Sequence, residues 1–337
     1  TDRHAALLRV FDHYRHTAQV ADALLHPHRD AMRLPEPQPG VTLAHPPHAD
    51  AALDWCRIEH GNIMASFRAA LSAGLATVAW HLARSMATYF DRQGHHQDWV
   101  ATHEAVLGVA DLLVDATAEA HCHRGLAGAY GAAGRTDEAR THLHRALHLY
   151  QQLGDQAGQA HTEHDLARLA YLRGDQPAAL RHSELALRLY RAAGHRGGEA
   201  NALNAVGWCL AQVDRGAEAL DACNGALALL RELGDRQGEA AVWDSLGYVH
   251  LLLGQWQQAT GCYETAVSQY RELGDRPQEA DTLDRLGDAW RAAGEPAAAR
   301  QAWLRSLEIW ERLAHPGAAA LRDKLNNSEP GDPRSGG

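Results

Sequence analysis

One phrase recurs in this chain at a spacing of 40 residues, and it constrains the fold more than any other feature of the sequence. Residues 190–200 read YRAAGHRGGEA, residues 230–240 read LRELGDRQGEA, residues 270–280 read YRELGDRPQEA, and a looser copy, YQQLGDQAGQA, occupies 150–160. A fixed period of roughly 20 to 50 residues is typical of solenoid proteins, in which each repeat packs mainly on its neighbours. The spacing therefore predicts a stack of similar structural units.

Each period contains two turns. One is the glycine of the recurring phrase, and the other recurs at Gly94, Gly134, Gly174, Asp214, Gly254 and Gly294. Glycine ends helices because it adopts the left-handed conformation without a side-chain penalty, and aspartate tolerates that conformation better than most residues. Asp235 and Asp275 stand where a helix needs an N-cap acceptor. Two turns per period, separated by apolar residues at helical spacing, predict one helical hairpin per repeat.

The composition favours helix throughout. Hydrophobic residues make up 45% of the chain, aromatic residues only 6%, and alternating β-branched runs are nearly absent. The predicted fold class is therefore all-α.

The repeats resemble tetratricopeptide repeats (TPRs), whose first helix carries Leu-Gly with an aromatic residue nearby and whose second helix carries small residues. The best matches are WDSLGYVH (243–250) followed by Ala259, Tyr263 and Ala266, LDRLGDAW (283–290) and LNAVGWCL (203–210); HRGLAGAY (123–130) and EHDLARLA (163–170) are looser. The period exceeds the usual 34 residues and is similar to the long-helix variant of kinesin light chain and bacterial sensor regulators. This resemblance implies a right-handed TPR superhelix, in which the small and apolar signature positions serve packing.

The chain is expected to divide into five parts. These are a helical segment with a proline-rich connector (1–48), a linker helix with a degenerate first repeat (49–116), five TPR repeats (117–316), a capping helix (317–327) and a disordered tail (328–337). A polar cap is expected because a solenoid exposes its last repeat.

The N-terminal segments add a second resemblance. LLRVFDHYRHTA, a proline-rich link and DWCRIEHGN, followed by the repeats, are similar to the C-terminal half of NB-ARC/STAND-type bacterial transcriptional regulators, including AfsR-like relatives of the antibiotic regulatory (SARP) proteins. The resemblance implies a parent regulator whose DNA-binding and nucleotide-binding domains are not in this chain. It also implies that residues 1–30 end the nucleotide-binding switch. The chain starts at Thr1 without methionine, which fits a piece of a longer protein.

Charge and motifs disfavour several other functions. The net charge is -10, whereas a nucleic-acid surface needs a basic face. Lys324 is the only lysine, so no phosphate-binding Walker loop is present, and no nucleophile motif appears. The five cysteines form no CxxC pair, no apolar run reaches membrane-spanning length, and no signal peptide is recognisable. We therefore expect a cytoplasmic, non-catalytic protein that contacts neither nucleic acid nor membrane.

Function is expected to reside where the repeats differ. In a TPR array, first-helix residues line the concave groove, and positions 40 residues apart should form rows along it. The predicted groove residues are Arg124, His161, His164, Arg168, Asn201, Asn204, Trp208, Asp244, Tyr248, Asp281, Asp284 and Asp288. Basic residues come first, amide and aromatic residues follow, and acidic residues come last, an order that suits a ligand with one acidic and one basic end.

Alternatives to this interpretation remain. The rows would also suit a solvated helical face without a ligand. The partner would be a peptide, protein or small effector that controls the parent's other domains, or the chain would be a scaffold for self-association or autoinhibition without an effector. No cofactor is expected. His121, His161 and His164 beside Glu163 could bind zinc or nickel, but no zinc motif accompanies them, so no metal site is predicted.

Overall fold

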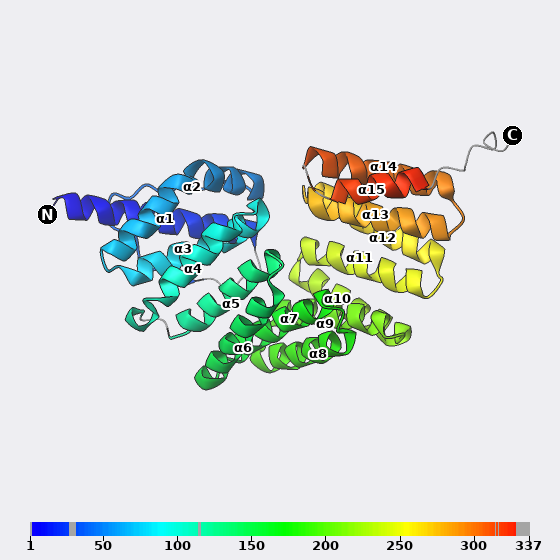
Figure 1. Ribbon diagram of the computed structural model, residues 1–337, viewed down its shortest axis with the longest axis horizontal. Helices are drawn as coiled ribbons and strands as arrows, with labels where there is room; N and C mark the ends of the chain where they lie inside the picture. Colours follow the sequence, from blue (N-terminus) through cyan, green and yellow to red (C-terminus); the bar gives the residue numbers. More distant parts are fainter. Residues whose placement is uncertain (1, 27–31, 114–115, 314, 316, 328–337) are drawn as a thin grey trace. The chain divides into compact units, whose positions relative to one another are not determined.

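In a computed structural model, residues 2–26, 32–113, 116–313, 315 and 317–327 are described. These residues form fifteen α-helices and one short 3-10 helix, and no strand occurs among them, so the predicted all-α class is confirmed. The chain divides into two compact units, Thr1–Arg173 and Gly174–Gly337 (Figure 1).

The first unit is built from seven α-helices. They are α1 (Asp2–Leu25), α2 (Ala49–Ser72), α3 (Ala76–Gln93), α4 (His96–Leu107), α5 (Ala118–Ala132), α6 (Thr136–Leu153) and α7 (Gln156–Leu172), with the 3-10 helix η1 (Ala110–Leu112) between α4 and α5. Helices α1, α2 and α3 all pack against one another. Their shared core contains Phe11, Trp80 and Phe90, each at most 1% exposed. Burying one such side chain stabilises the fold by roughly 1.5–3 kcal/mol.

The proline-rich connector lies along α1. The backbone amide of Gln38 donates to the Asp12 carboxylate (2.7 Å), and the amide of Ala44 donates to the Thr17 hydroxyl (3.2 Å). A buried ion pair between Arg15 and Asp12 (2.8 Å) holds the receiving carboxylate in place. The connector therefore satisfies its backbone groups through side chains of α1, since residues 32–48 have no regular secondary structure.

The second unit continues the series of helices. It contains α8 (Gln176–Ala193), α9 (Arg196–Gln212), α10 (Gly216–Leu233), α11 (Arg236–Leu252), α12 (Trp256–Glu272), α13 (Arg276–Ala292), α14 (Pro296–Arg312) and α15 (Gly317–Asn327). The pairs α9–α10, α11–α12 and α13–α14 form hairpins, and α15 packs on α14. The first helices also contact one another in series, α9 with α11 and α11 with α13, which creates one continuous helical face.

The turn residues behave as the sequence predicts. Gly234 and Gly254 adopt left-handed conformations, each with φ of 69°. Asp214, at φ 59°, is the one non-glycine residue with positive φ in the described part of the chain. The Asp235 carboxylate accepts from the amide of Gly238 (2.8 Å), and Asp275 caps α13 in the same way. These predictions are confirmed.

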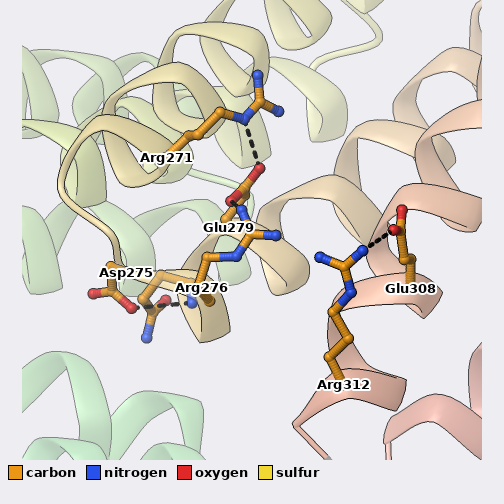
Figure 2. A network of polar contacts seen from close by, with 7 residues as sticks. Arg271, Asp275, Arg276, Glu279, Glu308 and Arg312 are labelled. Carbon is orange, nitrogen blue, oxygen red and sulfur yellow. Dashed lines mark hydrogen bonds and ion pairs between the residues drawn. The ribbon is translucent and has the colours of Figure 1, made fainter.

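In three of its four copies the recurring phrase also contains an arginine–glutamate ion pair, whereas the copy at 150–160 has glutamine at both positions. An arginine in the last turn of one helix meets a glutamate in the first turn of the next, eight residues later. The pairs are Arg191–Glu199 (2.8 Å), Arg231–Glu239 (3.5 Å) and Arg271–Glu279 (2.9 Å). Figure 2 shows the last of them, where Arg276 also reaches Glu279, and a separate pair between Glu308 and Arg312 on α14.

The burial of these glutamates decides how much each pair contributes. The side chain of Glu279 is only 2% exposed and that of Glu239 16%, whereas both arginines that face them are about half exposed. An exposed ion pair contributes at most about 1 kcal/mol, but an unpartnered buried carboxylate costs several kcal/mol. The two arginines on Glu279 therefore keep a buried charge compensated at the turn between repeats.

Two features bear on the predicted division of the chain. The boundary between the two compact units falls after Arg173, inside the block of 117–316 that the sequence predicts as five repeats, so that block stays a prediction. The predicted disordered tail, 328–337, lies outside the described residues. No helix in the described part of the chain is long and apolar enough to cross a membrane.

Candidate functional site

The glycine of the Leu-Gly signature fixes the position of each first helix in the second unit. A β-carbon added at Gly207, Gly247 or Gly287 would lie 2.4 Å from the Cys223 sulfur, 2.7 Å from the Tyr263 ring and 2.3 Å from the Trp303 ring, respectively. The contacted residues are themselves 40 residues apart on the second helices. Each glycine thus admits one side chain of the second helix.

An aromatic pair is formed by the residues that directly follow two of these glycines. Trp208 on α9 and Tyr248 on α11 stack with ring centroids 4.3 Å apart and ring planes 18° apart. Gln212, one turn after Trp208, donates to the Tyr248 hydroxyl (2.6 Å). Both rings are only half-buried, so each keeps accessible surface. The structure therefore brings together two predicted site residues from adjacent repeats.

Two predicted amides lie on the same helix as Trp208. Asn201, Asn204 and Trp208 follow one another at three- and four-residue spacing, so they share one face of α9. Asn201 is exposed and Asn204 half-buried. The Cys223 thiol lies 4.0 Å from the Asn204 amide oxygen, at the limit of a weak hydrogen bond to sulfur. Each of these amides can both donate and accept hydrogen bonds.

Asp244 has an intramolecular partner. The Arg285 guanidinium on α13 donates to the Asp244 carboxylate at 3.0 Å, and the aspartate is only 7% exposed. Burial raises the pKa of Asp244, although the adjacent Arg285 opposes that shift. The residue therefore joins α11 to α13 and presents little charge to a ligand.

Asp284 and Asp288 are paired as well. The ammonium group of Lys324, on α15, lies 2.5 Å from Asp284 and 3.0 Å from Asp288. The same group lies 5.5 Å from the centre of the Trp303 ring, within reach of a cation–π contact. The chain's one lysine thus pairs with both carboxylates, Arg291 lies 3.5 Å from Asp288 as well, and exposed Asp281 is the remaining acidic member of the set.

The first unit contains an ion pair at the positions equivalent to Asp244 and Arg285, with the acidic and basic residues exchanged. Arg124 on α5 donates to Asp165 on α7 at 2.6 Å. Burial alone would raise the pKa of Asp165, but Arg124 and Arg168 outweigh it and lower that pKa. Burial lowers the pKa of His164. Its buried Nδ1 atom has no hydrogen-bond partner among the described residues. Arg168 is exposed and His161 half-buried.

The sequence prediction does not include the partners of these residues. Asp165 and Arg285 each lie 41 residues after the residue that they pair with, and Lys324 lies 40 residues after Asp284. For the two arginine–aspartate pairs, opposite charges at one period plus one residue are a usable signal, since that offset places them on neighbouring first helices, whereas Lys324 lies at one full period from Asp284. The rows predicted at a spacing of 40 lack this offset.

A groove between α12, α13 and α14 is not predicted by the sequence. It has a volume of about 750 Å³, and its walls include Val267, Leu286, Trp290, Arg271 and Arg305. Apolar residues at helical spacing indicate core packing and groove lining equally well, so no sequence signal marks it.

The helical hairpins, the Leu-Gly contacts and the inter-repeat pairs together agree with comparisons to known proteins. The sequence profile of the tetratricopeptide repeat matches residues 116–192, 198–272 and 238–312, which together span more than half of the chain. The chain belongs to the tetratricopeptide repeat family. TPR arrays are typically non-catalytic scaffolds for protein interaction, which is the coarse function that the family indicates.

Solved structures share this fold. The apo form of RapI covers 77% of this chain and 95% of its own length, at 13% identity and a TM-score of 0.63. A Rap protein complexed with Competence and Sporulation Factor covers 97% of both chains, at 16% identity and a TM-score of 0.57. A STAND protein with a TPR sensor from Pyrococcus horikoshii covers 82% of this chain and 46% of its own, at 13% identity and a TM-score of 0.53. No curated protein matches the sequence significantly.

Proposed function

We propose that the second unit binds an extended peptide segment across α9 and α11, and that this TPR protein acts through that interaction without catalysis. The observation that carries the proposal is the half-buried stack of Trp208 on Tyr248 (4.3 Å). Tryptophan and tyrosine give large contact areas at low entropic cost and are enriched among residues that dominate binding energy. The stack is already formed, so binding does not have to order it.

The groups around the stack favour a peptide over a small apolar ligand. Asn201 and Asn204 can donate to and accept from an extended backbone. Asp281 is exposed on α13, while Asp244, Asp284 and Asp288 are each paired with a basic side chain, namely Arg285, Lys324 or Arg291. A peptide with an apolar or aromatic side chain for the stack and a basic side chain toward Asp281 therefore fits best.

The regulatory context is also a proposal. The N-terminal resemblance to STAND-type transcriptional regulators supports a parent protein in which this chain is the cytoplasmic sensor region, and the fold of a STAND protein with a TPR sensor is similar. The five cysteines, all within the described residues, are buried and form no disulfide, which suits a reducing compartment. Peptide or protein binding would then control the parent's DNA-binding domain, whereas this acidic chain itself contacts no nucleic acid.

A thermal-shift screen tests the proposal. The chain is heated with members of a library of short peptides of varied charge and aromatic content, and a binder at about 100 times its dissociation constant should stabilise the protein by roughly 2.7 kcal/mol. Peptides with a basic and an aromatic residue are expected among the hits. No hit, together with a melting temperature that rises with protein concentration, would instead support self-association.

A further inference from the structure

A second cluster of chemically active side chains lies in the first unit, outside the repeats that carry the proposed function. His60 is on α2, His95 is the N-cap residue of α4, and Asp98 is in the first turn of α4. One ligand atom from each lies within 4.8 Å of the others. In the described part of the chain, no other group of three histidine, cysteine or carboxylate side chains meets this distance, and His121, His161 and His164 do not form such a group.

We propose that His60, His95 and Asp98 bind one zinc ion. Zinc prefers imidazole and carboxylate ligands, and three protein ligands leave its fourth tetrahedral position to water. Bonds of about 2.0–2.1 Å place neighbouring ligand atoms about 3.4 Å apart. The His60 Nε2 atom and the Asp98 Oδ2 atom are already 3.1 Å apart. A ligand atom of His95 lies within 4.8 Å of the ligand atoms of His60 and Asp98, and the two imidazole centroids are 4.6 Å apart, so a small contraction completes the set.

Tyr89 on α3 positions both imidazoles. Its hydroxyl lies 3.2 Å from the His60 Nδ1 atom, which leaves the other ring nitrogen of His60 turned toward Asp98. The same hydroxyl lies 3.3 Å from the His95 Nε2 atom. Histidines that bind metals typically hydrogen-bond through the second ring nitrogen, which fixes the ring orientation. Tyr89 itself is only 1% exposed, so its position is fixed by the core.

The nearest arginine on α2 does not prevent a cation from binding at the cluster, because its charge is paired. The closest arginine on the same helix, Arg57, lies one turn before His60 and is paired with Asp54 at 3.0 Å. The metal would tie α2 to the start of α4 through the corner between α3 and α4. This inference does not depend on peptide binding by α9 and α11, because the cluster and that face lie in different units.

Cobalt(II) provides the direct test, because it replaces zinc and gives an intense visible spectrum only in a tetrahedral site. The full chain, stripped with chelator, is titrated with cobalt(II) and then with zinc. The expected result is a tetrahedral spectrum that saturates at one cobalt per chain and disappears when zinc displaces it. A weak octahedral spectrum at saturation would overturn the proposal.

Variants identify the ligands. Asp98→Asn preserves shape at a half-exposed position, and it should lower cobalt affinity at least tenfold, as should His60→Gln. Tyr89→Phe should lower affinity about tenfold while keeping the tetrahedral spectrum, as expected for an outer-shell residue. The matched control is His144→Gln, which alters an exposed histidine on α6. This variant should bind cobalt as tightly as the original protein does.

Two outcomes of the variant series would overturn the assignment. Equal affinity of Asp98→Asn and the original protein would exclude this site. Loss of binding in His142→Gln, with retention in Asp98→Asn, would place the metal at the neighbouring pair of His123 and His142, whose Nδ1 atoms lie 2.8 Å apart. Circular dichroism of each variant verifies that the helices persist, and Asp98→Asn keeps the test decisive even where His60→Gln fails to fold.

Discussion

At the residue scale, contacts inside the fold explain why certain positions are glycine and why the pKa of a buried histidine is lowered. Gly247 is helical, and alanine would normally be favoured there by about 1 kcal/mol. An added methyl group would nevertheless lie 2.7 Å from the fully buried Tyr263 ring. Overpacking of this kind typically costs about 1–3 kcal/mol, so the contact outweighs the helix propensity and explains why this residue is glycine.

The first prediction follows from that comparison. Gly247→Ala should lower the free energy of unfolding by about 1–2 kcal/mol. Its matched control is Gly261→Ala on α12, where nothing lies within 4 Å of the added carbon, and this variant should gain roughly 0.5–1 kcal/mol. Urea unfolding followed by circular dichroism measures both. A stabilised Gly247→Ala protein would contradict the packing argument.

The second prediction concerns His123, which packs against His142 in the first unit. Burial, helped by His142 and Arg145, lowers the pKa of His123 from 6.5 to about 4. The unfolded chain therefore binds more protons than the folded chain between these pH values, and stability falls as pH falls through this window. Above about pH 6.5 the residue has no such effect.

His123→Gln removes this proton linkage. Between pH 7 and pH 5 the variant should lose about 1–2 kcal/mol less stability than the original protein, since one pH unit inside the window is worth up to about 1.4 kcal/mol. Urea unfolding at the two pH values gives the difference, in which contributions from the other histidines cancel. Identical pH sensitivity of both proteins would show that His123 is not held neutral.

At the element scale, first helices of successive repeats are joined by charge pairs whose polarity changes along the chain. Arg124 on α5 pairs with Asp165 on α7, whereas Asp244 on α11 pairs with Arg285 on α13. The two pairs occupy equivalent positions with the charges exchanged. This equivalence implies that the location matters for joining helices and that the order of the charges does not.

The third prediction uses this symmetry. Asp244→Arg places two guanidinium groups together at a mostly buried position and should cost more than about 3 kcal/mol. Adding Arg285→Asp recreates the polarity of the first-unit pair and should recover at least half of the loss. A double-mutant cycle in urea isolates the coupling. If the double variant lost the sum of the stabilities that the two single variants lose, the pairs in the two units would not be equivalent.

The sequence predicts helix ends better than contacts between helices. Helix ends depend on local backbone geometry, which a few neighbouring residues specify. The turn glycines, Asp214 and the N-caps Asp235 and Asp275 could therefore be predicted from short sequence patterns. The partner Arg285 lies one residue out of the 40-residue register from Asp244, and this offset depends on how α11 and α13 rotate about one another. Lys324 lies in register with Asp284, so extending that row by one period would have placed it there, just as register places Trp208 beside Tyr248.

At the scale of the whole molecule, the chain combines a repeat region with a structurally distinct N-terminal part. The repeat motifs resemble those of the TPR family, and the family profile confirms this resemblance over more than half of the chain. The cluster of His60, His95 and Asp98 could not be predicted in this way, because its residues lie before the regular repeats, carry no metal-binding motif and meet only through the packing of α2 beside the start of α4.

The central claim is that α9 and α11 form the binding face, and calorimetric titration tests it most directly. A peptide selected by thermal shift is titrated into the original chain, Trp208→Ala and the control Trp256→Ala, which alters a half-buried tryptophan on α12. Trp208→Ala should bind at least about 30-fold more weakly, equivalent to about 2 kcal/mol, while Trp256→Ala should bind normally. Equal affinity of Trp208→Ala and the original chain would contradict the account.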